Sequence, residues 1–160
     1  LNTPQPARIV LTHPAGWIAS GFGIGLSPRA PGTVGSLVAL LPWWFFLQHQ
    51  SLPVYLGVLL LAFIIGIWAD GWVIGKTGIE DPSVVVWDEF IGQWIALLLA
   101  PAGWLWMLGG FALFRLFDIW KPWPVSWADR ELHGGLGAML DDVLAGVYAF
   151  AALQSIAFFI

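Results

Sequence analysis

Nine of the ten acidic residues occur in three short polar segments of an otherwise apolar chain, and the first segment contains two pairs of adjacent acids. It reads EDPSVVVWDEF, residues 80–90, with Asp88 directly before Glu89. Adjacent carboxylates repel each other unless a cation or a base neutralises them, and hard oxygen ligands of this kind suit Mg²⁺. The segment therefore predicts a cation site, although both acids could instead interact with the positive end of a helix dipole.

The second segment combines two basic residues with one acid. It reads FRLFDIWKPWP, residues 114–124, and places Arg115 and Asp118 three positions apart on one helix face. Lys121 precedes Pro122, which disfavours helical backbone before it, so the helix should end there. Arg115 and Asp118 could form a simple ion pair. Together with Lys121, however, they could also hold a phosphate dianion, with Arg as a bidentate fork and Lys as a point charge.

The third segment joins a histidine, several glycines and a second acidic pair. It reads DRELHGGLGAMLDDVLAG, residues 129–146. We expect a glycine-rich bend that lets backbone approach a ligand closely, followed by a helix with Asp141 and Asp142 in its first turn. The two acids would oppose an anion unless a metal lay between them. His133 titrates near neutrality, so it could protonate a leaving group, although a lone histidine is more often structural.

Composition predicts that a membrane surrounds the elements that position these residues. Of the 160 residues, 59% are hydrophobic and 10% are charged, whereas soluble domains carry about 25% charged residues. Twelve Trp and a mean hydropathy of +0.80 agree with this. The net charge of −4 argues against nucleic acid as a partner, and the absence of Cys excludes disulfides and cysteine nucleophiles. We expect one domain, residues 1–160.

The apolar runs predict an all-α integral membrane protein, a compact bundle of about five short transmembrane helices. The runs cover residues 34–47, 54–69, 88–100, 104–117 and 141–160. Thr33 or Ser36 could cap the N-terminus of the helix predicted from the first run. Residues 15–33 are rich in Gly and Pro, and we expect a re-entrant or interfacial segment there. Because the chain begins at Leu1 without a basic region before an apolar run, we expect no secretory signal peptide and a trimmed N-terminus.

A break at residues 101–103 decides where the charges lie. A continuous helix over 88–119 would be about 48 Å long and would separate its charged ends across the bilayer, whereas a hairpin returns them to one side. With five alternating spans, all six Lys and Arg and all ten Asp and Glu fall on one face. The positive-inside rule makes this face cytoplasmic. It does not account for the acids, which suggest a metal or an ionic substrate.

Four motifs in order give the chain a family resemblance. GLSPRAPGTVGSL, VVWDEFIG, FRLFDIWKPWPV and HGGLGAMLDDVLAG resemble the bacterial phosphatidylglycerophosphatase A family, over nearly the whole chain. The resemblance implies a Mg²⁺-dependent phosphatase of the bacterial inner membrane that acts in phospholipid biosynthesis. Its phospholipid substrate would be phosphatidylglycerophosphate, which it would convert to phosphatidylglycerol and inorganic phosphate.

The resemblance also carries over a set of functional residues by motif position, to which we assign roles. The expected metal ligands are Asp81, Asp88, Glu89, Asp141 and Asp142. The expected catalytic residues are Asp88, Glu89, Asp118, His133 and Asp142. The expected substrate-binding residues are Ser27, Thr33, Ser36, Arg115 and Lys121. We expect Arg115 and Lys121 to clamp the phosphate, with attack either by water or through an aspartyl-phosphate intermediate.

Two alternative functions, neither of them enzymatic, also fit parts of the sequence. A small ion or solute transporter could use membrane-embedded acids as a cation path, although the uncharged loops at 48–53 and 101–103 count against it. A noncatalytic lipid-binding or assembly subunit would need the acids only for solvation. Phosphate release from the lipid, with Mg²⁺ and with chelator, distinguishes all three. The sequence does not indicate an oligomeric state.

Overall fold

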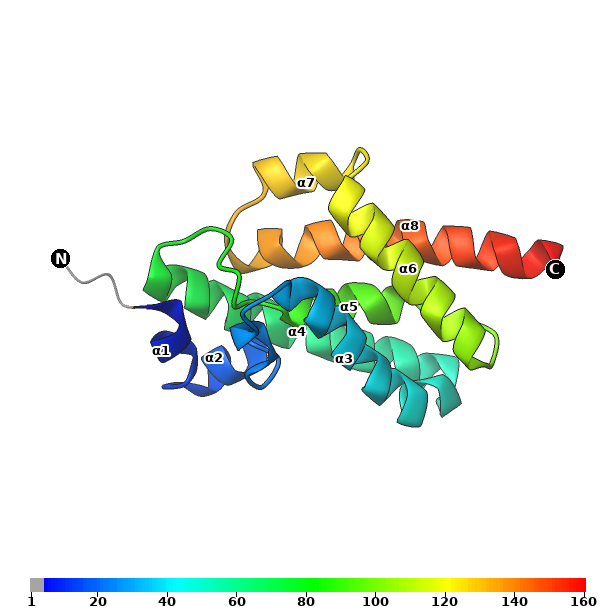
Figure 1. Ribbon diagram of the computed structural model, residues 1–160, viewed down its shortest axis with the longest axis horizontal. Helices are drawn as coiled ribbons and strands as arrows, with labels where there is room; N and C mark the ends of the chain where they lie inside the picture. The colour runs from blue at the N-terminus through cyan, green and yellow to red at the C-terminus, as the bar shows by residue number, and fades with distance from the viewer. Residues whose placement is uncertain (1–4) are drawn as a thin grey trace.

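The computed structural model describes residues 5–160, and these fold entirely as helices without a strand (Figure 1). The prediction of an all-α chain is thus confirmed for this range. The elements are α1 Pro6–Val10, α2 Pro14–Ala19, η1 Ile24–Leu26, α3 Pro31–Phe45, η2 Leu47–His49, α4 Leu52–Thr77, α5 Trp87–Ala96, α6 Trp104–Trp120, α7 Val125–Glu131 and α8 Gly134–Phe159. The expectation of a trimmed N-terminus concerns chain before Leu1 and stays a prediction.

Two helices, α4 and α8, are long and apolar enough to cross a membrane. Each has 26 residues, which corresponds to about 39 Å at 1.5 Å per residue. Large apolar side chains point outward along α4, as at Leu60 and Leu61, which are each 61% exposed. The other predicted spans correspond to shorter helices, namely α3 with 15 residues, α5 with 10 and α6 with 17. The count of about five spans therefore stays a prediction.

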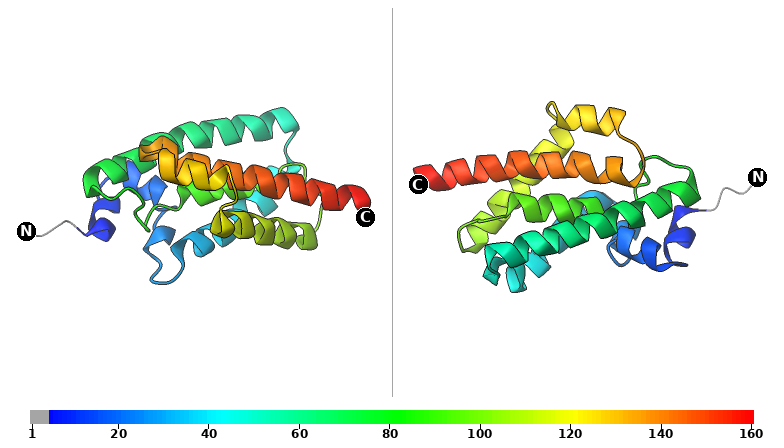
Figure 2. Two further views of the ribbon diagram at one scale, coloured as in Figure 1. Left: turned by 90° about the horizontal axis from the view of Figure 1, so that it is seen from above. Right: turned by 180° about the vertical axis from the view of Figure 1, so that it is seen from behind.

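Helix α8 is the common packing partner in the bundle. It lies against α4, α5, α6 and α7, while the short α5 also packs against α3 (Figures 1 and 2). The core between them is almost entirely apolar and includes Trp43, Ile91 and Met139. Because α5 is enclosed by α3, α4, α6 and α8, polar side chains at its start can meet side chains from four other helices.

The chain bends at Gly134, which has a φ of 70°, but the following glycines are already helical, so the last helix begins earlier than predicted. Helix α8 begins at Gly134, so Asp141 and Asp142 lie about two turns inside it rather than in its first turn. A Cβ on Gly135 would overlap the carbonyl oxygen of Ile67 in α4. The glycines therefore allow two helix backbones to pack closely.

The start of the first predicted span also differs from the expectation. Helix α3 begins at Pro31 with Ala30 as its N-cap, so neither Thr33 nor Ser36 caps it. Proline fits the first helical position because its fixed φ suits the helix and its missing N–H would have no intrahelical partner there. Residues 15–33 are partly helical, through α2 and η1. Their placement at a membrane interface stays a prediction.

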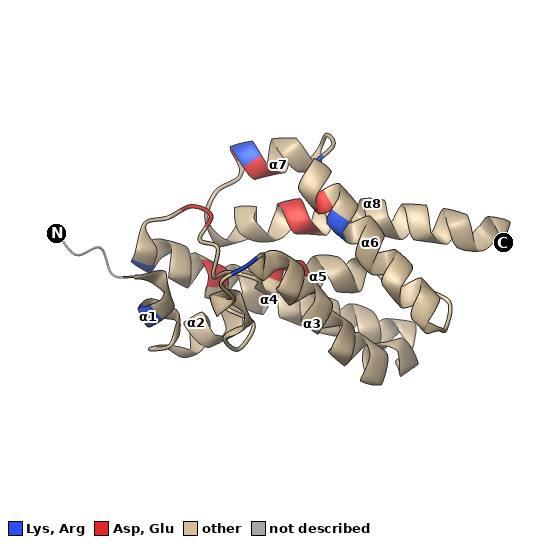
Figure 3. Ribbon diagram, in the orientation of Figure 1, with Lys and Arg blue, Asp and Glu red and all other residues tan. Residues whose placement is uncertain are grey.

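The predicted hairpin is confirmed, with a wider turn than expected. Helix α5 ends at Ala96 and α6 begins at Trp104, and Gly103 turns the chain at a φ of 125°. Helix α6 ends at Trp120, and Lys121 follows as its C-cap, as the proline predicted. The charged residues gather toward one end of the helices, and the opposite ends of α6 and α8 carry none (Figure 3).

Candidate active site

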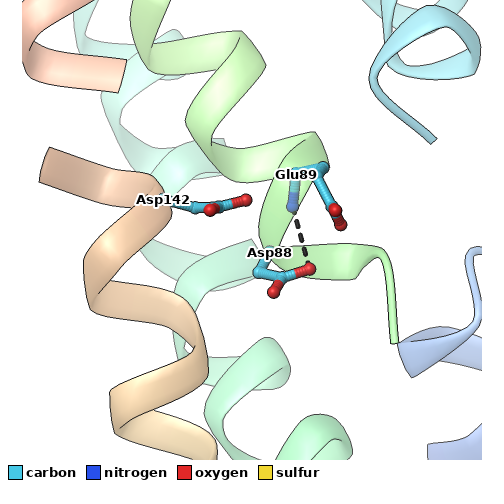
Figure 4. Close-up of side chains that lie close together, drawn as sticks. All are labelled: Asp88, Glu89 and Asp142. Carbon is cyan, nitrogen blue, oxygen red and sulfur yellow. Dashed lines mark hydrogen bonds between the residues drawn. The ribbon is translucent and has the colours of Figure 1, made fainter. Parts of the chain in front are cut away.

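Three carboxylates from two helices converge where α5 begins. Asp88 and Glu89 lie in the first turn of α5, and Asp142 reaches them from α8 (Figure 4). One oxygen from each carboxylate lies within 4.8 Å of the others. The amide N–H of Glu89 donates to Asp88 Oδ1 at 3.0 Å. Asp142 is buried, with 4% of its surface exposed.

Small residues at the α5–α8 crossing bring these acids together. A Cβ on Gly92 would lie 2.7 Å from the carbonyl oxygen of Asp142, and a Cβ on Gly146 would meet the carbonyl oxygen of Gly92. No larger residue could occupy either position without moving one of the helices. The glycines therefore let α8 approach α5 closely enough for Asp142 to reach the Asp88–Glu89 pair.

Helix α6 adds an arginine and a further acid on the other side of α5. Arg115 Nη1 forms an ion pair with Asp118 Oδ2, at 15% and 12% side-chain exposure. The same nitrogen donates to Ser36 Oγ at 3.4 Å. A Cβ on Gly32 would lie close to both Glu89 Oε1 and Arg115 Nη1, which places the Arg115–Asp118 pair beside the carboxylate cluster. The hairpin thus brings together two polar segments that are far apart in sequence.

Helix α3 contacts this group through its first turn. A Cβ on Gly32 would overlap Glu89 Oε1 and would lie 3.7 Å from Arg115 Nη1. The first amides of a helix have no intrahelical acceptors and favour anions. Ser36 is fully buried one turn further on, where its hydroxyl donates to the Gly32 carbonyl at 3.0 Å. The start of α3 therefore borders both the acids and the arginine.

Lys121 lies beside the cluster and contacts two acids. Its Nζ is 2.7 Å from Asp129 Oδ1 and 2.8 Å from Asp141 Oδ2. Burial alone would lower the pKa of Lys121, but hydrogen bonds and attraction from Asp129 and Asp141 raise it above its usual range. The ammonium group is therefore charged at neutral pH, and it already compensates Asp141.

A small cavity of about 80 Å³ opens next to Asp88. Its lining includes Glu80, Asp81, Asp129, His133 and Asp141. His133 precedes α8 and its Nδ1 lies 3.8 Å from Glu80 Oε2, with both side chains about two-thirds exposed. His133 and Asp81 therefore belong to the mouth of the site rather than to its buried part.

The predicted site residues fall into four groups by location. The buried or half-buried centre contains Asp88, Glu89, Arg115, Asp118, Asp142 and Ser36. Lys121 and Asp141 are paired beside it, and Asp81 and His133 line the cavity mouth. Thr33 lies in the first turn of α3, whereas the hydroxyl of Ser27 donates to the carbonyl of Arg29 at 3.0 Å in the loop before it.

One acid near the site was not predicted as part of it. Asp70 is fully buried in α4 and neither of its carboxylate oxygens has a hydrogen-bond partner among the described residues. The second predicted span ends at residue 69, directly before Asp70, but α4 continues to Thr77. The available signal was an acid inside an apolar helical run, which is costly unless it has a functional partner.

Comparison with known proteins identifies the family. A family model described as Phosphatidylglycerophosphatase A matches residues 17–157. The chain is 42% identical over 151 residues to Phosphatidylglycerophosphatase A of Escherichia coli (strain K12), covering 94% of this chain and 87% of the relative. It is 39% identical over 150 residues to Phosphatidylglycerophosphatase A of Haemophilus influenzae, covering 93% and 92%.

A third relative has a different name. It is a Bacteroides thetaiotaomicron protein called "Putative phosphatidylinositol-3-phosphatase", 46% identical over 140 residues, which cover 83% of this chain and 87% of the relative. No solved structure matches the chain. The family match and the two relatives of the same name nevertheless agree over almost the whole length. This chain therefore belongs to the phosphatidylglycerophosphatase A family, whose members are phosphoric monoester hydrolases.

Proposed function

We propose that this protein hydrolyses phosphatidylglycerophosphate to phosphatidylglycerol and inorganic phosphate, with Mg²⁺, at the cytoplasmic face of the bacterial inner membrane. The observation that carries the proposal is that an arginine lies close to a carboxylate cluster. Glu89 forms a cluster with Asp88 and Asp142. A Cβ on Gly32 would meet both Glu89 and Arg115, so the arginine lies near this cluster. A phosphomonoester needs both a cation and a guanidinium close to its oxygens.

The donor set of the cluster fits Mg²⁺. Glu89 Oε2 and Asp142 Oδ2 are buried without hydrogen-bond partners among the described residues, so both have free lone pairs. Three carboxylates and no sulfur or imidazole ligand suit a hard cation. Asp88, Glu89 and Asp142 would hold the ion. When bound, Mg²⁺ neutralises phosphate charge and lowers the pKa of a bound water.

Arg115 orients the phosphate in this proposal. Its Nε is buried without a partner among the described residues, and the ion pair with Asp118 uses Nη1. The guanidinium therefore retains donors for a phosphate oxygen, while Asp118 and Ser36 fix its position. Lys121 is engaged by Asp129 and Asp141, so its main role would be to raise the positive potential nearby.

Hydrolysis breaks the bond between phosphorus and the terminal oxygen of the lipid headgroup, and that oxygen must take a proton. His133 lines the same cavity as Asp88 and is accessible to solvent, so it could donate this proton and recover it from water. The oxygen of the attacking water remains on the released phosphate. The products are then phosphatidylglycerol with a free hydroxyl and inorganic phosphate.

The apolar surface supports a membrane location for this reaction. Helices α4 and α8 would cross the bilayer, with α3 and the α5–α6 hairpin embedded beside them. All Lys and Arg lie toward the end that contains the carboxylate cluster, which favours a cytoplasmic orientation for that end (Figure 3). The lipid would then reach the site while its acyl chains stay in the bilayer.

The test is phosphate release by the purified protein in detergent. We expect release from phosphatidylglycerophosphate with Mg²⁺ and loss of release with chelator. Phosphatidylinositol 3-phosphate is the comparison substrate, because the Bacteroides relative is named for it. No release from phosphatidylglycerophosphate, or release unaffected by chelator, would contradict the proposal. Family membership does not favour the alternative of an ion or solute transporter.

A further inference from the structure

Asp70 is the most buried acid near the cluster, and no hydrogen-bond donor among the described residues compensates its negative charge. It is 0% exposed, and both of its carboxylate oxygens lack hydrogen-bond partners among the described residues. Asp141, in contrast, has Lys121 as an ionic partner. An isolated carboxylate in an apolar interior costs several kcal/mol, so it needs a cation or a proton.

Helix packing directs Asp70 toward the start of α5 and α8. One turn before Asp70, a Cβ on Gly66 would contact Trp87 and Met139, and one residue after it, Gly71 lies against Gly135. Asp70 therefore occupies the part of α4 that is enclosed by these two helices. Trp87 directly precedes Asp88, so the side of α4 that carries Gly66 and Asp70 packs against the start of α5. Asp70 thus lies beside the carboxylate cluster.

The charges around the cluster do not balance with one divalent cation. Six acids gather there, namely Asp70, Asp88, Glu89, Asp118, Asp141 and Asp142. The two basic side chains that form ion pairs with them are Arg115 and Lys121. Full ionisation of these six acids leaves a net charge of about −4 even before Asp129, the second partner of Lys121, is counted, so one Mg²⁺ does not balance the cluster.

We propose that Asp70 and Asp88 hold a second divalent cation, next to the one assigned to Asp88, Glu89 and Asp142. The identity of that first site rests on the proposed function. The unpartnered oxygens of a fully buried Asp70 supply free ligands, and Asp88 directly follows Trp87, against which α4 packs one turn before Asp70. The competing explanation is that Asp70 is protonated and only fills space.

Manganese binding distinguishes these two explanations without an activity measurement. Mn²⁺ prefers the same oxygen ligands, and its bound fraction can be measured by electron paramagnetic resonance in detergent. We expect about two Mn²⁺ per wild-type chain, with magnetic coupling between them, and about one uncoupled Mn²⁺ in Asp70→Asn. One Mn²⁺ in the wild-type protein, or two coupled ions in Asp70→Asn, would overturn the proposal.

A matched control separates a local effect from a general loss of charge. Glu131→Gln removes one acid from the exposed end of α7, outside the cluster, and should leave the Mn²⁺ count unchanged. If Asp70→Asn does not fold, the wild-type count and its magnetic coupling still decide the proposal. Two coupled ions without phosphate release would contradict only the proposed function. Phosphate release with a single bound ion would contradict only the second site.

Discussion

Gly32 contacts the carboxylate of Glu89 so closely that a methyl group at position 32 would overlap Oε1. The contact joins the first turn of α3 to the first turn of α5, and Arg115 lies within reach of both. A glycine is needed at this point because of space and not because of backbone conformation, since residue 32 is inside a helix. Glu89 is therefore positioned by a neighbour that has no side chain.

Gly32→Ala should lower turnover by about 10-fold or more, since a displacement of about 1 Å at a catalytic group can cost 10²-fold. The added methyl group must move either Glu89 or α3. The matched control is Gly75→Ala, because a Cβ there meets nothing within 4 Å on an exposed part of α4. Phosphate release per folded molecule is the measurement. Equal activity of both variants would show that the Gly32 contact does not position Glu89.

Asp88→Asn and Asp142→Asn should each abolish Mg²⁺-dependent turnover, by about 10²-fold or more, while the protein still folds. Each change keeps the side-chain shape and removes one negative ligand from a cluster in which the carboxylates lie within 4.8 Å of one another. In the absence of metal, the loss of repulsion should make both variants at least as stable as the wild type.

Thermal unfolding with and without Mg²⁺ provides the second readout for these two variants. The wild type should gain stability from the ion, because a ligand that binds only the folded state stabilises it. The gain should be reduced in both variants. Near-normal turnover in both would remove Asp88 and Asp142 from the site.

The helices of this bundle were more predictable than their ends. The apolar runs and the break near Pro101 correctly predicted the α5–α6 hairpin, because glycine and proline interrupt a helix locally. The predicted start of α8 was wrong by several residues, since Gly134 turns the chain and Gly135 lies in a helix crossing against α4. Nothing in the local sequence distinguishes a glycine that bends the chain from one that allows two helices to approach.

The site was predictable where acids and bases lie near helix ends, as with Asp88, Glu89 and Arg115. Asp70 was missed because its importance depends on the packing of α4 against α5 and α8, which no local pattern encodes. The same limit applies to Lys121, whose contacts with Asp129 and Asp141 depend on the position of α7 beside α8.

Lys121→Met should reduce both stability and activity, because it leaves the largely buried carboxylate of Asp141 without its basic partner. Asp129→Asn is the control, since it removes only the more exposed of the two ion pairs, with Asp129 at 40% side-chain exposure. Exposed pairs contribute about 0–1 kcal/mol, so this control should unfold near the wild-type temperature. If both variants are equally affected, the pair with Asp141 has no special role.

Cysteine labelling should show that the charged end of the bundle faces one side of the membrane. The chain has no native Cys, so Ser51→Cys, Ser83→Cys and Ser126→Cys each introduce a single thiol. Ser83 follows α4 and Ser126 lies in α7, both near the acids, whereas Ser51 lies in the uncharged loop before α4. Reagents should reach residues 83 and 126 from the cytoplasmic side and residue 51 from the other. Labelling of 83 and 126 from opposite sides would exclude a single shared site.

Arg115→Lys distinguishes a phosphate ligand from a structural ion pair. Lysine keeps the charge beside Asp118 but loses the planar fork, so a phosphate-binding role predicts a loss of about 10²–10³-fold in turnover with little change in stability. A purely structural pair should tolerate lysine. The control is Arg115→Ala combined with Asp118→Ala, which leaves neither partner charged and should therefore be more stable than Arg115→Ala alone. Wild-type turnover per folded Arg115→Lys molecule would show that the guanidinium is not required, and Lys121 would then be the remaining basic group of the site.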